Sequence, residues 1–206
     1  MQKIIWAAAI FLGLLLGFLL FFRPAPLPER KWLESESEMH KVKRITQAQV
    51  EAEALRLGDT LVNTADSLLH LRLAAAYQTG GLGAALKQYP PQQYPEVQAF
   101  ARKYAATAAR TGQQLPAAAK AQVAGQTEVL YTKGIYINDA LCLKCHGVVG
   151  QEVTATALTE LQQAYPGFKA TGFKMGQASG SWQVRFKRHL ILENLSRRSR
   201  KSLRPQ

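Results

Sequence analysis

The sequence predicts an α+β fold in which an N-terminal transmembrane helix precedes one globular domain. Three observations support this prediction. An uncharged apolar run occupies residues 4–22, a helical hydrophobic period fills residues 46–78, and residues 126–137 and 182–186 have the composition or alternation of strands. At 206 residues, 47% of them hydrophobic, the chain has room for one domain of ordinary size besides the membrane segment.

The apolar run at residues 4–22 is long enough, as a helix, to cross about 28 Å of hydrocarbon. A cleaved signal peptide is the alternative, but the run is long for one and no clear small-residue cleavage site follows it. We therefore expect residues 1–22 to be an uncleaved membrane anchor. Residues 23–45 contain closely spaced prolines and alternating Ser and Glu, and they are predicted to be an extended linker.

Apolar residues recur at steps of three and four along residues 46–78, which is the period of an amphipathic helix, and Gly80-Gly81 ends the pattern. A second helix is predicted for residues 94–111, after a Pro-Pro break. Residues 126–137 are rich in Val, Tyr and Ile and are predicted to be a strand. Residues 155–164 are predicted to be a short helix.

The last part of the chain combines an alternating stretch with a basic tail. Alternation from Trp182 to Phe186, after Gly176 and Gly180, predicts a hairpin whose second strand is residues 182–186. In the tail, residues 188–206, clustered Arg and Lys follow several aliphatic residues. The tail is predicted to be a basic amphipathic helix that contacts anionic lipid or an acidic protein. A solvated, extended tail is the alternative.

Both cysteines of the chain lie in the segment Cys142-Leu143-Lys144-Cys145-His146. This spacing is typical of covalent attachment of one haem c, in which two thiols about one helical turn apart bind the porphyrin. The histidine that follows binds the iron as proximal ligand. We expect the other ring nitrogen of His146 to donate a hydrogen bond to a backbone carbonyl.

Two other interpretations of this motif are a zinc half-site and a redox dithiol. Zinc would need two further ligands, and the sequence has no second cysteine pair or His-x3-His pair to supply them. A dithiol motif should follow a strand, whereas the residues before Cys142 look like a loop that enters a short helix. The five-residue pattern therefore favours haem.

Three stretches give the chain a family resemblance, and together they span about residues 50–187. They are Gly80-Gly81 with Ala84-Ala85-Leu86, the haem motif with Gly147, and the run from Tyr165-Pro166 to Gly180. With them the chain resembles a family of single-haem c-type cytochrome domains with a PAS-like fold, catalogued largely as a domain of unknown function and suspected to be haem-based redox sensors. The resemblance implies an antiparallel sheet flanked by helices, with the haem held between them, in a haem c domain at residues 46–187.

The sequence leaves several candidates for the distal iron ligand. Met175 would give His/Met ligation, and its alternative role is to fill a gap in the core. His70 on the long helix would give His/His ligation. Members of the resembled family often carry a cysteine ligand shortly after the double glycine, and Tyr89 occupies that place here. A Tyr89 phenolate, another group and an open site are the remaining alternatives.

We find no nucleophile elbow, P-loop or His-Glu-x-x-His motif, so we expect a protein that is not an enzyme and whose chemistry is that of its haem. The predicted function is electron transfer by a membrane-anchored monohaem cytochrome that cycles between Fe(II) and Fe(III), with a redox partner protein or membrane complex. The alternative is a haem-based redox or gas sensor that signals to a separate partner protein.

Two observations on location conflict. Lys and Arg are more frequent after the apolar run than before it, which by the positive-inside rule favours a cytoplasmic domain. Thioether attachment of haem takes place on the outer face of the energy-transducing membrane, and we give this requirement more weight. We therefore expect a single-pass protein of the inner membrane with a periplasmic haem domain. The net charge of +12 suggests acidic partners or lipid, and without a nucleic-acid motif we expect no nucleic-acid binding.

Overall fold

The computed structural model of the protein describes residues 45–202, with side chains as far as Arg197. The predicted anchor at residues 1–22 and almost all of the predicted linker lie outside the described residues. Within the described part, no helix combines the length and the apolar character that a membrane crossing requires.

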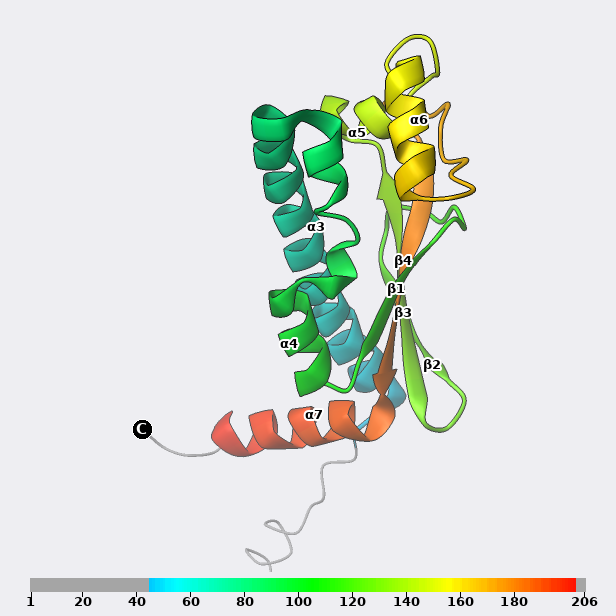
Figure 1. The fold of residues 1–206 in the computed structure, drawn as a ribbon. Helices are drawn as coiled ribbons and strands as arrows, with labels where there is room; N and C mark the ends of the chain where they lie inside the picture. The colour runs from blue at the N-terminus through cyan, green and yellow to red at the C-terminus, as the bar shows by residue number, and fades with distance from the viewer. Residues whose placement is uncertain (1–44, 203–206) are drawn as a thin grey trace, which may run out of the picture. The chain divides into compact units, whose positions relative to one another are not determined.

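The described chain contains five α-helices, one short 3₁₀ helix and four strands (Figure 1). In order they are α3 (Gln47–Leu86), η1 (Pro91–Gln93), α4 (Pro95–Lys103), β1 (Thr107–Thr111), β2 (Lys120–Ala124), β3 (Glu128–Tyr136), α5 (Ala140–His146), α6 (Ala155–Ala164), β4 (Ala178–Lys187) and α7 (Arg188–Ser202). The strands form one antiparallel sheet in the order β1-β4-β3-β2. The predicted α+β class is confirmed, whereas the PAS-like arrangement stays a prediction.

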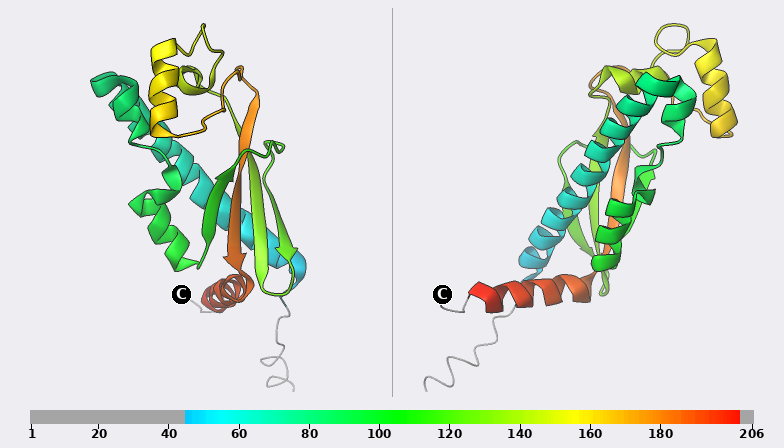
Figure 2. Two further views of the ribbon diagram at one scale, coloured as in Figure 1. Left: turned by 45° about the vertical axis from the view of Figure 1, so that its right-hand side comes forward. Right: turned by 60° about the vertical axis from the view of Figure 1, so that its left-hand side comes forward.

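The helices cover one face and both ends of this sheet. Figures 1 and 2 show α3 and α4 along one face, α5 and α6 at one end, and α7 at the other. The strand predicted at residues 126–137 is present as β3, and the short helix predicted at residues 155–164 is α6.

The long amphipathic helix predicted from residue 46 is α3. Thr46 and Gln49 form a capping box at its start, in which each side chain accepts a hydrogen bond from the backbone N–H of the other residue. The backbone leaves the helical conformation at Gly80 and Gly81, and Gly81 has a φ of 64°, which favours glycine. The chain folds back there, so the last turn of α3 runs beside the turns before Gly80 (Figure 1).

The core lies between α3 and the inner faces of β3 and β4. Val129 and Tyr131 of β3 stand opposite Phe186 and Val184 of β4, and all four are fully buried. The apolar stripe of α3 packs on them through Val50, Ala54, Leu57, Leu61 and Ala65. The other face of the sheet carries polar side chains, so the strands show the in-and-out alternation of an antiparallel sheet that is covered on one side.

Three polar side chains of α3, spaced one turn apart, are bonded to the sheet. The pairs are Tyr131 Oη to Asp59 Oδ1 at 2.8 Å, Lys133 Nζ to Asn63 Oδ1 at 2.8 Å and Trp182 Nε1 to Asp66 Oδ1 at 3.0 Å. Because they lie on one helix face, these bonds fix the rotation of α3 about its axis as well as its position along the sheet.

Two predicted elements are wrong. The predicted helix at residues 94–111 stops at Lys103, the chain turns through Ala105 with a φ of 43°, and residues 107–111 form the edge strand β1. The predicted hairpin at residues 176–186 is not formed, because β4 pairs with β1 and β3 and not with the segment just before it. The strand β2 was not predicted.

The C-terminal helix predicted from the basic tail is α7, and it packs on the first turns of α3. Ile191 is fully buried in the core. Asn194 Nδ2 donates to Glu53 Oε1 at 2.6 Å, and Arg56 binds the same carboxylate. The described part of the tail is therefore helical and docked, as opposed to extended.

Gly58 provides a test of the packing between α3 and β3. A β-carbon at this position would overlap the ring of Tyr131, which is buried and held by Asp59. We expect Gly58→Ala to lower the free energy of unfolding by about 2 kcal/mol in urea denaturation, although alanine favours helix.

Gly83→Ala is the matched control, because a β-carbon there would meet only Glu160 Oε2 at 3.8 Å. This variant should be neutral or more stable by up to about 1 kcal/mol. Equal losses in the two variants would contradict a tight contact at Gly58.

Candidate functional site

The helix α5 carries the Cys-x-x-Cys-His motif. Asp139 caps its start, with Oδ1 accepting from the Leu141 N–H at 2.6 Å, and the Gly147 N–H donates to the Leu143 carbonyl at its end. A helical backbone places Cys142 and Cys145, three residues apart, on one side of α5. Both are free thiols and both are half-buried.

His146 is the last residue of α5 and is held by the loop that follows α6. Its Nδ1 lies 2.7 Å from the carbonyl oxygen of Ala170. Because a carbonyl only accepts, Nδ1 carries the proton and Nε2 keeps the lone pair that binds a metal. The hydrogen bond to a backbone carbonyl that the sequence predicted is therefore present. Burial lowers the pKa of His146, so the imidazole is neutral at pH 7.

The same loop surrounds the histidine with aromatic rings. The ring centroids of Phe168 and Phe173 lie 5.8 and 6.4 Å from that of His146. The Phe173 N–H donates to the His146 carbonyl at 2.9 Å, which ties the loop to the end of α5. The position of His146 is thus set by contacts on two sides of the ring.

Cys142, Cys145 and His146 all line one pocket of about 340 Å³. The long helix α3 contributes Leu69, Leu73 and Tyr77 to its walls. Further apolar walls come from β3, α6 and the loop at residues 168–170. The pocket is therefore mainly apolar, with two thiols and one imidazole on the side formed by α5.

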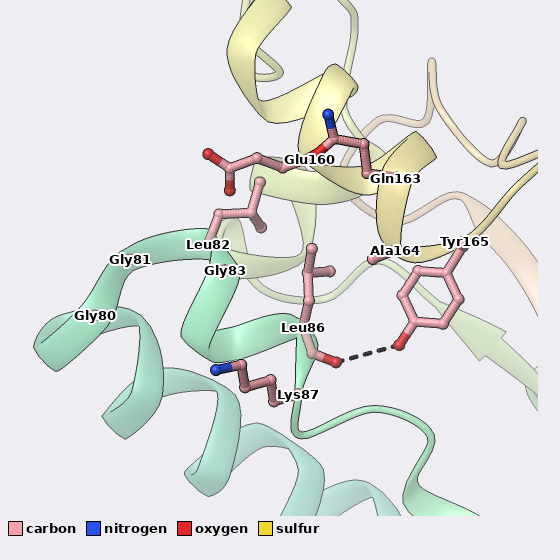
Figure 3. Close-up of a pocket in the computed structure, with 10 residues that line it drawn as sticks. All are labelled: Gly80, Gly81, Leu82, Gly83, Leu86, Lys87, Glu160, Gln163, Ala164 and Tyr165. Carbon is pink, nitrogen blue, oxygen red and sulfur yellow. Dashed lines mark hydrogen bonds between the residues drawn. The ribbon is translucent and has the colours of Figure 1, made fainter.

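Tyr165 closes the pocket towards a neighbouring groove, which lies between α6 and the last turn of α3. Its ring points to α3, and its hydroxyl donates to the carbonyl of Leu86 at 3.2 Å (Figure 3). Tyr165 lines both the pocket and the groove, so this bond joins the two walls where they meet.

These residues fit a covalently held haem. A tetrapyrrole needs apolar walls, a neutral imidazole with a free Nε2 and, for c-type attachment, two thiols one turn apart, and the pocket offers all of these. In residues 45–202 no group of three or more His, Cys, Asp or Glu side chains is placed to hold a bare metal ion. The zinc alternative therefore finds no ligand set in the described part of the chain.

Burial also changes the acidity of the two thiols. Burial, with a smaller effect of the Asp139 charge, raises the pKa of Cys142. Burial and the neighbouring Cys142 raise the pKa of Cys145 to about 11. Both thiols are therefore protonated at neutral pH as long as no group is attached to them.

Neither of the two residues named first as distal ligands lines the pocket. Met175 lies in the loop between α6 and β4 and is 53% exposed. His70 is also not among the residues that line the pocket. Its Nε2 lies 3.2 Å from Asp139 Oδ2, at the start of α5. The third candidate, Tyr89, does line the pocket, and the distal ligand itself stays a prediction.

Arg110 is a pocket residue that the sequence did not single out. It lies on β1, in a segment whose local pattern predicted a helix. Only the pairing of β1 with β4, which sets Arg110 opposite Trp182, brings it to the pocket. This contact joins residues that are far apart in the chain, and no local signal marks it.

Comparison with known proteins finds a matching family model and a solved structure with some similarity. The model of the Tll0287-like family, described as Tll0287, matches residues 35–186. The crystal structure of the cyanobacterial haem protein Tll0287 matches with 19% sequence identity and a TM-score of 0.40, over 64% of this chain and 94% of that chain. No curated protein matches the chain.

The raised thiol pKa values predict slow alkylation of the folded protein made without an attached cofactor. Because a raised pKa leaves less thiolate at a given pH, Cys142 and Cys145 should react slowly with iodoacetamide at neutral pH, and faster as the pH rises towards about 11. The same chain in urea, with thiol pKa values near about 8.5, is the control and should react faster at neutral pH. Equal rates would contradict the burial of the thiols.

Proposed function

The chain belongs to the Tll0287-like family, and from this premise we propose that it binds one covalent haem c and works through one-electron oxidation and reduction of the iron. Tll0287 itself is described as a cyanobacterial haem protein. The observation that carries the proposal is the convergence of Cys142, Cys145 and His146 on a single apolar pocket.

Each residue of the motif has one task in this proposal. Cys142 and Cys145 hold the porphyrin through thioether bonds, and His146 binds the iron through Nε2. The haem, when bound, supplies a centre that gains and loses one electron. The hydrogen bond from His146 Nδ1 to Ala170 fixes the imidazole plane and makes Nε2 a stronger donor. The apolar walls keep water out, so nearby charges influence the potential more strongly.

Electron transfer is the role we propose first. Tyr89 and Lys144 line the pocket and are exposed, so its rim is accessible to a partner. The partner would be a separate redox protein or a membrane complex of which this chain is a subunit. No reaction on a substrate is required for this role, in keeping with a protein that is not an enzyme.

A haem-based redox or gas sensor is the second candidate, and one observation favours it. The wall that α3 forms carries Leu69, Leu73 and Tyr77, none of which is a strong ligand of ferrous iron. Haem held in this pocket would then have no second histidine or methionine ligand from these walls, which would leave its iron open to a small gas molecule. Its binding would shift the surrounding wall and signal to a separate protein.

The location is also part of the proposal. Residues 4–22 would anchor the chain in the inner membrane with the haem domain on the periplasmic side, as thioether attachment requires. Basic side chains of α7, such as the exposed Arg197, would contact anionic lipid or an acidic protein.

Covalent attachment can be tested directly. We expect the protein, expressed with a c-type maturation system, to keep its haem on a denaturing gel and to show a c-type α band after reduction in pyridine. The double variant Cys142→Ser/Cys145→Ser should lose the gel-stable haem, because no thioether can form. Met175→Leu, a change outside the pocket, is the control and should keep it. Absence of haem from the unchanged protein would overturn the proposal.

Carbon monoxide distinguishes the two roles. The sensor predicts that carbon monoxide shifts the visible spectrum of the reduced protein, because no histidine or methionine besides His146 lines the pocket in the described chain. This result supports the sensor. An unchanged spectrum would mean that a strong sixth ligand is in place, and electron transfer would then be the better supported role.

A further inference from the structure

We infer that Arg110 binds a propionate carboxylate of the haem, an inference that rests on the proposed function. Haem is an apolar ring with two carboxylates as its charged side groups. The pocket is apolar and has one guanidinium on its sheet side, so the chemistry of the ligand and of the lining match.

The guanidinium of Arg110 is held between two aromatic rings. Its Cζ lies 5.3 Å from the ring centroid of Trp182 and 5.4 Å from that of Tyr89. Trp182 is fully buried, and its Nε1 donates to Asp66 at 3.0 Å. The indole is therefore fixed, and it gives the planar guanidinium a rigid surface to lie against.

Arg110 has no acidic partner in the described part of the chain. No hydrogen bond or ion pair there engages its guanidinium, whereas Arg72 is paired with Glu96, and both Arg185 and Lys187 are paired with Glu128. Asp66 feels the charge of Arg110, but its carboxylate is already bound to the indole N–H of Trp182. The N–H groups of Arg110 therefore have no acceptor in the described part of the chain, and water or a ligand in the pocket must supply one.

A propionate satisfies this requirement better than other ligand groups. Arginine binds a carboxylate with two parallel N–H···O bonds, which makes the pair both strong and directional. Lys144 also lines the pocket, but it lies on α5 and is exposed to water. Its charge is screened, so Arg110 is the cation with the larger effect on the bound group.

The test compares Arg110→Gln and Arg110→Lys with Lys144→Gln in the full-length haem-loaded protein. The first readout is the equilibrium constant for reduction by a redox dye at neutral pH and fixed salt. A nearby cation stabilises the more electron-rich ferrous state, so Arg110→Gln should lower this constant on the order of tenfold. Lys144→Gln should lower it clearly less, and Arg110→Lys should stay close to the unchanged protein, because the charge is kept.

The second readout distinguishes a direct hydrogen bond between Arg110 and the propionate from an effect of the Arg110 charge on the iron alone. The propionate bending mode in the resonance Raman spectrum responds to hydrogen bonding of the carboxylate. It should shift in both Arg110 variants, because lysine cannot reproduce the paired bonds, and it should not shift in Lys144→Gln. Should Arg110→Gln fail to fold, the shift in Arg110→Lys decides.

Two results would overturn the inference in different ways. If the Arg110 variants carry haem and show an unchanged propionate mode, Arg110 does not bind the propionate although the haem proposal stands. If the unchanged protein carries no covalent haem, the proposed function fails and the inference fails with it.

Discussion

The packing of α3 against the inner faces of β3 and β4 is the contact on which the pocket depends. Asp59, Asn63 and Asp66 bind the sheet along one face of the helix. Leu69, Leu73 and Tyr77 continue that face by further turns and become a wall of the pocket. The bonds that fix the rotation of α3 therefore also determine that Leu69, Leu73 and Tyr77 face the pocket. Trp182 connects the helix packing to the pocket. Its indole N–H donates to Asp66 of α3, and its ring lies against the guanidinium of Arg110.

Elements with strong local patterns could be predicted from the sequence. The helical period of α3, the β-rich composition of β3 and the alternation of β4 are properties of short segments. β1 and β2 are short, rich in alanine and half exposed, so their composition does not distinguish strand from helix or loop. The partner of β4 was mispredicted for a related reason. Glycines indicate a turn, but pairing with β1 and β3 is decided by which apolar faces meet the core, and these strands come much earlier in the chain.

The candidate site likewise has a part that local sequence predicts and a part that only the tertiary fold determines. The Cys-x-x-Cys-His motif is local, because two cysteines and a histidine on one helix turn lie together in any fold, and the structure brings all three to one pocket. The other walls come from distant segments: Leu69 precedes Cys142 by 73 residues (142 − 69), and Arg110 reaches the pocket only through the pairing of β1 with β4. Met175 and His70 were chosen for the chemistry of their side chains. In the structure His70 contacts Asp139 at the start of α5, and Met175 is exposed in the loop before β4.

The pocket and the start of the domain lie at opposite ends of one continuous helix. From Thr46 to Leu73, α3 rises by about 40 Å at 1.5 Å per residue, and α7 packs on its first turns, where Asn194 binds Glu53. Direct electron tunnelling through protein does not bridge such a span at a useful rate. A partner bound near α7 or the first turns of α3 would therefore lie far from the pocket, at the other end of the same helix. In the proposed function, a tilt or rotation of α3 would carry a signal between these two ends, whereas an electron would leave through the exposed rim of the pocket.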